Sequence, residues 1–202
     1  MWIKLGILLT GFAYAGLLPY TLKRSLQNID IDLKSETLSF LSNKSLYDKK
    51  YVKAYTEYLF AVAILLYIFF WLLSEYYDLG QYEHLMKLLD YCCILFTMLA
   101  FIPHNIEPYS FKRLKKTLQR LIHNILGGLV FLALPSLIIF FQITIMKTMP
   151  FLGISGLIII GVVVITSAIS LFTKGITGLT ELLFMNGISI WGIYVTIITI
   201  LS

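Results

Sequence analysis

The chain has 202 residues, of which 58% are hydrophobic and 13% are charged, and its formal net charge is +5. A soluble domain of this length cannot bury so much apolar surface, so the composition excludes one and requires lipid to cover the excess. The positive charge does not indicate nucleic-acid binding, because the basic residues stand between hydrophobic segments, where they meet anionic lipid headgroups.

Six stretches are apolar enough to form helices that cross a bilayer core, which needs roughly 20 residues per helix. We therefore predict an all-α integral membrane bundle that forms a single domain over residues 1–202. The predicted transmembrane helices are residues 2–22, 56–75, 88–103, 118–142, 149–172 and 179–201.

The connections and helix interiors carry several further signals. No small-residue cleavage site follows the first span, so we interpret it as a membrane helix and not as a signal peptide. Residues 23–53 form the longest predicted polar loop, in which we expect short interfacial helices. The third span must include Asp90 to reach full length, and Pro135 predicts a kink in the fourth.

The Lys and Arg residues predict an orientation. Thirteen of the sixteen lie around the loops after the first, third and fifth spans, and Lys4, Lys87 and Lys147 lie on the other side. Cytoplasmic loops are enriched in basic residues, so we expect both termini outside and those three loops in the cytoplasm. The expected location is the bacterial inner membrane.

Polar groups at the cytoplasmic ends of four spans are the candidate functional residues, because such groups are costly in a membrane. If the helices form one bundle, these groups converge on a polar cavity open to the cytoplasmic leaflet. The candidates are Glu57, His104, Glu107, His123, Asn124 and Glu181.

The start of the fourth span adds two basic candidates, Lys116 and Arg120, on a polar stripe with helical spacing that also includes His123 and Asn124. In one interpretation, Lys116 and Arg120 bind a lipid phosphate while His123 pairs with Glu181 or transfers a proton. In the other, the stripe is a basic membrane anchor and a backbone carbonyl satisfies His123.

Zinc-dependent lipid hydrolysis is an alternative, because His104, His123, Glu107 and Glu181 include the ligand types that zinc accepts. No compact ligand motif supports it, so we predict no metal and no cofactor. The two cysteines are adjacent and provide neither a disulfide framework nor a zinc cluster. We interpret the many Tyr and Phe residues as lipid contacts and interfacial belts.

Two short motifs resemble a known family. Phe101-Ile102-Pro103 precedes a basic linker and Leu121-Ile122-His123-Asn124, and the last span begins Gly178-Leu179-Thr180-Glu181. This order resembles the bacterial domain of unknown function 998 family of six-helix proteins, which is grouped with the Frag, DRAM and Sfk membrane proteins. The resemblance implies that His123 and Glu181 occupy the family's corresponding positions, and it suggests a role connected with lipid remodelling, autophagy or membrane-lipid regulation, to which the group's eukaryotic relatives are tied. It also implies that the first loop lies outside, opposite to the side that the charges predict.

Three functions remain open at this point. The first is a lipid-binding or lipid-handling protein whose polar cavity receives a headgroup at the cytoplasmic leaflet. The second is the zinc-dependent hydrolase, and the third is a non-catalytic subunit of a larger membrane complex. The expected partners are membrane lipids, with partner membrane subunits or a homo-oligomer as further candidates.

Overall fold

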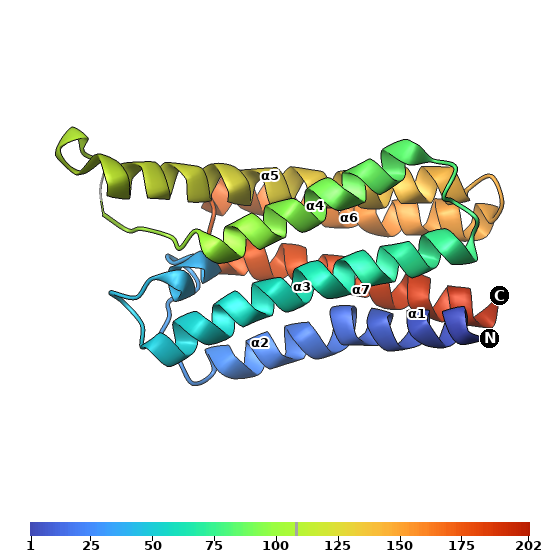
Figure 1. The fold of residues 1–202 in the computed structure, drawn as a ribbon, viewed down its shortest axis with the longest axis horizontal. Coiled ribbons are helices and arrows are strands. Elements are labelled where there is room, and N and C mark those ends of the chain that lie inside the picture. Colours follow the sequence, from blue (N-terminus) through green and yellow to red (C-terminus); the bar gives the residue numbers. More distant parts are fainter. Residues whose placement is uncertain (108) are drawn as a thin grey trace.

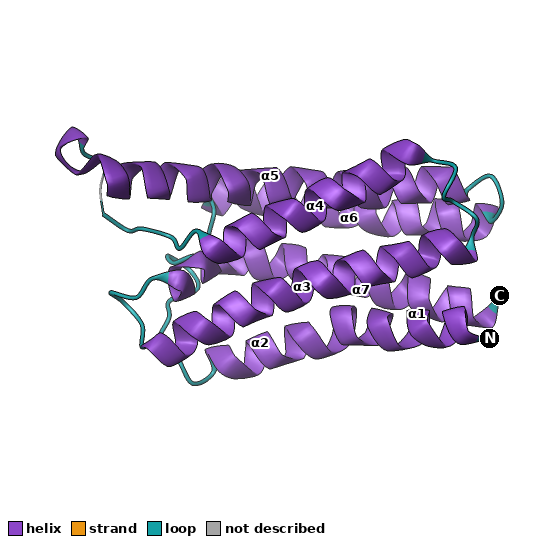
Figure 2. Ribbon diagram, viewed as in Figure 1, coloured by secondary structure: helices purple, strands orange, loops and turns teal. Residues whose placement is uncertain are grey.

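The computed structural model of the protein describes residues 1–107 and 109–202, and all regular structure in them is helical (Figure 2). The first span is a continuous rod made of α1, the π-helical turn η1 and α2. The elements are α1 (Trp2–Phe12), η1 (Ala13–Leu17), α2 (Leu18–Leu26), the 3-10 turn η2 (Leu38–Ser42), α3 (Lys49–Tyr76), α4 (Glu83–Phe101), the 3-10 turn η3 (Phe111–Arg113), α5 (Leu114–Ile145), α6 (Pro150–Lys174) and α7 (Gly178–Leu201).

Six helices are long and apolar enough to cross a membrane, which confirms the predicted all-α bundle and makes the chain a multi-pass membrane protein. Each spanning helix packs against the next one in chain order, and α7 packs back against α1. The six spans therefore form a closed ring of neighbours. The two termini lie together at one end, and the connections α2–α3, α4–α5 and α6–α7 lie at the other, which we call the loop end (Figure 1).

The helices extend further than hydropathy predicts. α2 continues to Leu26 and α3 begins at Lys49, so the first connection is shorter than the predicted loop 23–53. α5 begins at Leu114 and continues through Pro135, and α4 begins at Glu83. Hydropathy detects the apolar part of a helix, whereas backbone hydrogen bonds continue the helix into its charged flanking turns.

Aromatic side chains fill the centre of the ring. Phe69 and Phe70 of α3, Phe141 of α5 and Trp191 of α7 are at most 2% exposed, and their ring centroids lie 5.6 to 6.5 Å apart. Gln142 is fully buried beside them. With its amide oriented to satisfy both partners, it accepts from Trp191 Nε1 at 2.8 Å and donates to the Leu152 carbonyl at 2.9 Å.

Candidate functional site

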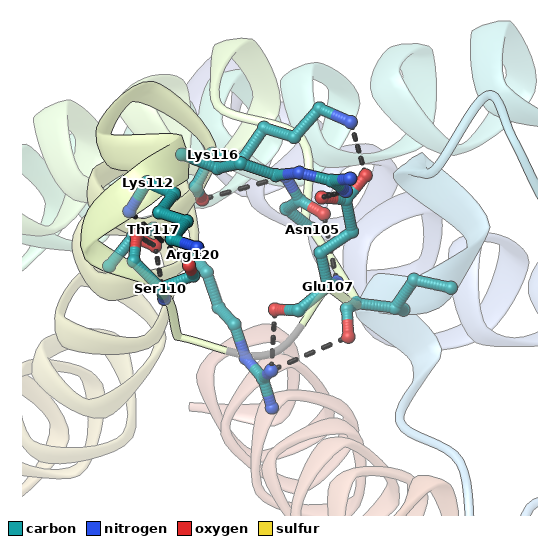
Figure 3. Close-up of polar contacts among 9 residues, drawn as sticks. Asn105, Glu107, Ser110, Lys112, Lys116, Thr117 and Arg120 are labelled. Atoms are coloured by element: carbon teal, nitrogen blue, oxygen red, sulfur yellow. Dashed lines mark hydrogen bonds and ion pairs between the residues drawn. The ribbon is translucent and has the colours of Figure 1, made fainter.

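The predicted polar stripe of α5 contacts the connection that precedes it (Figure 3). Glu107 forms ion pairs with Lys116 and with Arg113, the latter at 2.8 Å. Arg120 Nη1 donates to the Glu107 carbonyl at 2.8 Å, and its guanidinium lies 4.8 Å from the centre of the Tyr109 ring. Lys116 and Arg113 lower the pKa of the Glu107 carboxyl below its usual range.

Further hydrogen bonds join the same two segments. Gln119 Nε2 donates to the Pro103 carbonyl at 2.8 Å, and Asn124 Nδ2 donates to the Tyr109 hydroxyl at 3.2 Å. Lys116, Arg120 and Asn124, all candidates for a headgroup site, are thus engaged by the connection between α4 and α5. We call residues 102–107 and 109–110 the α5 clamp, because they hold the first turns of that helix.

The two candidate histidines lie together, His104 within this clamp and His123 on α5. Their ring centroids are 5.0 Å apart, and His123 Nδ1 donates to the Ile102 carbonyl at 2.6 Å. The His104 ring packs on Phe40 at 4.9 Å, and its Nδ1 has no partner among the described residues. Burial, and then the nearby His123 and Arg120, lower the pKa of His104 from 6.5 to about 4, so its ring is neutral at physiological pH.

The remaining acidic candidates do not join the histidines. Glu57 is exposed and forms an ion pair with Lys53 at 3.5 Å. No hydrogen bond or ion pair links Glu181 to His104 or His123 in the described part of the chain. Within residues 1–107 and 109–202, no group of three or more His, Cys, Asp and Glu side chains is placed to hold a metal ion.

Glu181 instead anchors residues 33–42, a segment that crosses the loop end of the ring. The amides of Gly178 and Leu179, at the start of α7, donate to the carbonyls of Glu36 at 2.6 Å and Leu33 at 3.0 Å. The Glu181 carboxylate accepts from the Leu38 amide at 2.5 Å. These bonds satisfy helix N-terminal donors and fix the position of Leu38.

The same segment also reaches the clamp. Ser42 Oγ accepts from the His104 amide at 2.7 Å, and Leu38 and Leu41 are buried. We call residues 33–42 the strap, because they connect the N-terminus of α7 with the connection after α4. The strap therefore covers the loop end of the bundle.

A cavity of about 110 Å³ lies inside the ring beneath the strap, and we call it the chamber. Five of the six spans and Leu38 of the strap supply its walls. Among the described residues, Glu181 is the only acidic or basic one that lines it. Its aromatic lining residues are Tyr14, Tyr55, Tyr58, Phe96, Phe131 and Phe184.

The tyrosines of the chamber correct, for these positions, the interpretation of the many Tyr and Phe residues as lipid contacts and interfacial belts. Tyr14 and Tyr55 are 7% and 9% exposed, so they face the interior of the ring and not lipid. No hydrogen bond to the hydroxyls of Tyr14, Tyr55 or Tyr58 is found among the described residues, although buried tyrosines usually have one. The sequence did contain a weak signal, because Tyr55, Tyr58, Leu59 and Val62 share one helical face.

Two surface grooves flank α2 and share residues with the chamber. The groove toward α3 has a volume of about 510 Å³ and includes Tyr55 and Tyr58. The groove toward α7 has a volume of about 450 Å³ and includes Pro19 and Met185. All four side chains also line the chamber, so each groove adjoins it.

The π-helical turn η1 immediately precedes α2 and contains Tyr14. Such turns interrupt the regular hydrogen-bond pattern of a helix and occur frequently at functional sites. The first span is therefore irregular at the depth of the chamber. Comparisons of the chain with family models, with curated proteins and with solved structures found no match.

Proposed function

We propose that the protein binds a membrane lipid, with the lipid's polar end in the chamber and its apolar part in a groove beside α2. The observation that carries this proposal is a chamber with apolar walls that also holds Glu181 and three tyrosine hydroxyls, and those hydroxyls have no hydrogen-bond partner in the described part of the chain. Polar groups in such an environment are unfavourable unless something hydrogen-bonds to them. A ligand that enters the chamber supplies that partner.

The size of the chamber limits which part of a lipid enters it. An engineered cavity of roughly 150 Å³ holds one benzene molecule, so a chamber of about 110 Å³ admits only the small terminal group of a headgroup and not acyl chains. The two grooves are larger and open at the surface. We propose that they hold the glycerol and the upper part of the chains.

The charge distribution supports a choice of leaflet. Thirteen of the sixteen Lys and Arg residues flank the connections at the loop end, so we propose that this end faces the cytoplasm of a bacterial inner membrane. The ligand then comes from the cytoplasmic leaflet. We propose Glu181 and the tyrosines as the headgroup site, because the clamp already engages Lys116 and Arg120.

A variant that fills the chamber tests the proposal. Val62 is 7% exposed and lines the chamber, so Val62→Trp should displace the ligand. Ile165→Trp is the matched control, because Ile165 is 60% exposed on the outer face of α6. We expect mass spectrometry to find a lipid retained through detergent washing by the wild type and by Ile165→Trp. Equal retention by Val62→Trp, with an unchanged melting temperature, would exclude the chamber as the binding site.

A further inference from the structure

We propose that the chamber receives a small organic cation, an ammonium or quaternary ammonium group, which is either the headgroup of a lipid or a free solute. This inference rests on the proposed function and specifies its ligand. It follows from the charge of Glu181, the aromatic walls around it, and the basic residues in the adjoining grooves.

Glu181 has no positive partner of its own. The ion pairs found in the described ranges join Lys53 with Glu57, Lys87 with Glu83, and Arg113 and Lys116 with Glu107. The one hydrogen bond that the Glu181 carboxylate accepts within residues 1–107 and 109–202 comes from the Leu38 amide. A carboxylate among apolar side chains is strongly favoured to take up either a proton or a cation, and the other walls of the chamber favour the cation.

Those walls contain six aromatic side chains. Tyr55 and Tyr58 are stacked with centroids 6.4 Å apart, and Phe131 and Phe184 lie 4.5 Å apart. The electron-rich faces of aromatic rings attract cations, and proteins recognise quaternary ammonium groups with cages of such rings. A proton on Glu181 needs no cage. The combination of one carboxylate with aromatic walls therefore matches an ammonium group of limited size.

The grooves add a complementary feature for a zwitterionic lipid. Lys50 lines the groove toward α3, and Lys23 lines the groove toward α7. Each groove adjoins the chamber through shared side chains, so a phosphate in the groove lies next to a cation in the chamber. The positive charge of either lysine suits the phosphate, and Glu181 suits the ammonium group.

The test compares choline with its neutral isostere, in which a carbon atom replaces the nitrogen. Both are titrated into the purified protein, and binding is measured by calorimetry. We expect the wild type to prefer choline by about tenfold or more, since desolvated cation–π and charge interactions together reach that size. Glu181→Gln should lose the preference while keeping its melting temperature, because a glutamine oxygen still accepts from the Leu38 amide. Glu83→Gln, which changes an exposed carboxylate at the start of α4, should behave as the wild type.

A second arm distinguishes the lipid from the free solute. The protein is placed in nanodiscs that contain both phosphatidylcholine and phosphatidylglycerol, and the lipids that remain after extraction are quantified. Preferential retention of phosphatidylcholine that Glu181→Gln abolishes, without choline binding, supports a lipid headgroup as the source. Choline binding without lipid selectivity supports the free solute.

Two results would overturn the inference in distinguishable ways. In the first, the neutral isostere binds as tightly as choline and Glu181→Gln leaves lipid selectivity unchanged, so the ligand is not a cation. Loss of lipid in Val62→Trp would still uphold the proposed function in that case. If no probe binds and Val62→Trp retains lipid as the wild type does, both proposals fail.

Discussion

Gly153 of α6 lies where a single methyl group decides whether two helices fit. A Cβ atom at this position would lie 2.6 Å from the backbone Cα of Met146 and 3.0 Å from the Gln142 carbonyl oxygen. A Cβ at Gly161 of the same helix would meet open space. The packing of α6 therefore requires glycine at position 153 but not at position 161.

We expect Gly153→Ala to lower stability by about 1–3 kcal/mol, because the backbone of Met146 must move to admit the methyl group. Gly161→Ala should be neutral or stabilising by up to about 1 kcal/mol, because alanine favours helix. Thermal unfolding in detergent, followed by circular dichroism, measures both. Equal melting temperatures for the two variants would contradict the described contact between α5 and α6.

The buried His104 ring predicts a pH dependence of stability. Its pKa in the folded state is about 4, below the ordinary 6.5, so the unfolded chain takes up a proton that the folded chain does not. Stability should therefore fall as the pH drops from 6.5 toward 4. Between pH 6.5 and 5 we expect a loss on the order of 1 kcal/mol from this group, after allowance for solvent screening.

The variant His104→Gln should show a smaller loss of stability over the same pH range than the wild type. His84 is exposed, so His84→Gln is the matched control and should keep the wild-type pH dependence. Melting temperatures at pH 7 and pH 5 provide the comparison. A wild-type slope that persists in His104→Gln would assign the effect to another group.

At the scale of elements, the α5 clamp depends on Glu107, which pairs with both Arg113 and Lys116. We expect Glu107→Gln to increase amide hydrogen exchange in the clamp without changing the melting temperature of the bundle, since these pairs are at the surface. Lys116 and Arg113 hold the pKa of Glu107 below its usual range. The ion pairs therefore persist in mildly acidic solution and are lost only as the pH falls through that lowered pKa.

Hydrogen exchange followed by mass spectrometry tests this prediction. Glu57→Gln removes an exposed carboxylate that pairs only with Lys53, and it should leave the exchange of the clamp unchanged. If Glu107→Gln and Glu57→Gln give the same exchange in the clamp, the ion pairs of Glu107 do not hold this connection.

The sequence predicted which elements exist better than it predicted what they enclose. Apolar length alone identified all six spans, because a bilayer requires it. The sequence identified Glu181 as a polar group at a helix end, but its contact with Leu38 depends on how the first connection folds. Tyr14 could not be assigned to the chamber, because a span that is apolar on every side does not reveal which face points inward.

At the scale of the whole molecule, the ring places both termini at one end and the basic connections at the other. We predict that the loop end is cytoplasmic. In a background with Cys92→Ala and Cys93→Ala, Ser202→Cys should react with a membrane-impermeant thiol reagent in intact cells. Ser45→Cys, in the exposed connection between α2 and α3, should react only after the membrane is permeabilised. The opposite labelling pattern would reverse the orientation and the leaflet.

The central claim is that the ring holds a lipid headgroup in the chamber beneath the strap. Photocrosslinking with a phospholipid that carries a diazirine on its headgroup tests this most directly, because mass spectrometry then identifies the labelled peptides. We predict adducts on α3 around Tyr58 and on α7 around Met185, both of which line the chamber. Adducts confined to the segment of Lys116 and Arg120, or to the outer faces of the helices, would contradict the account.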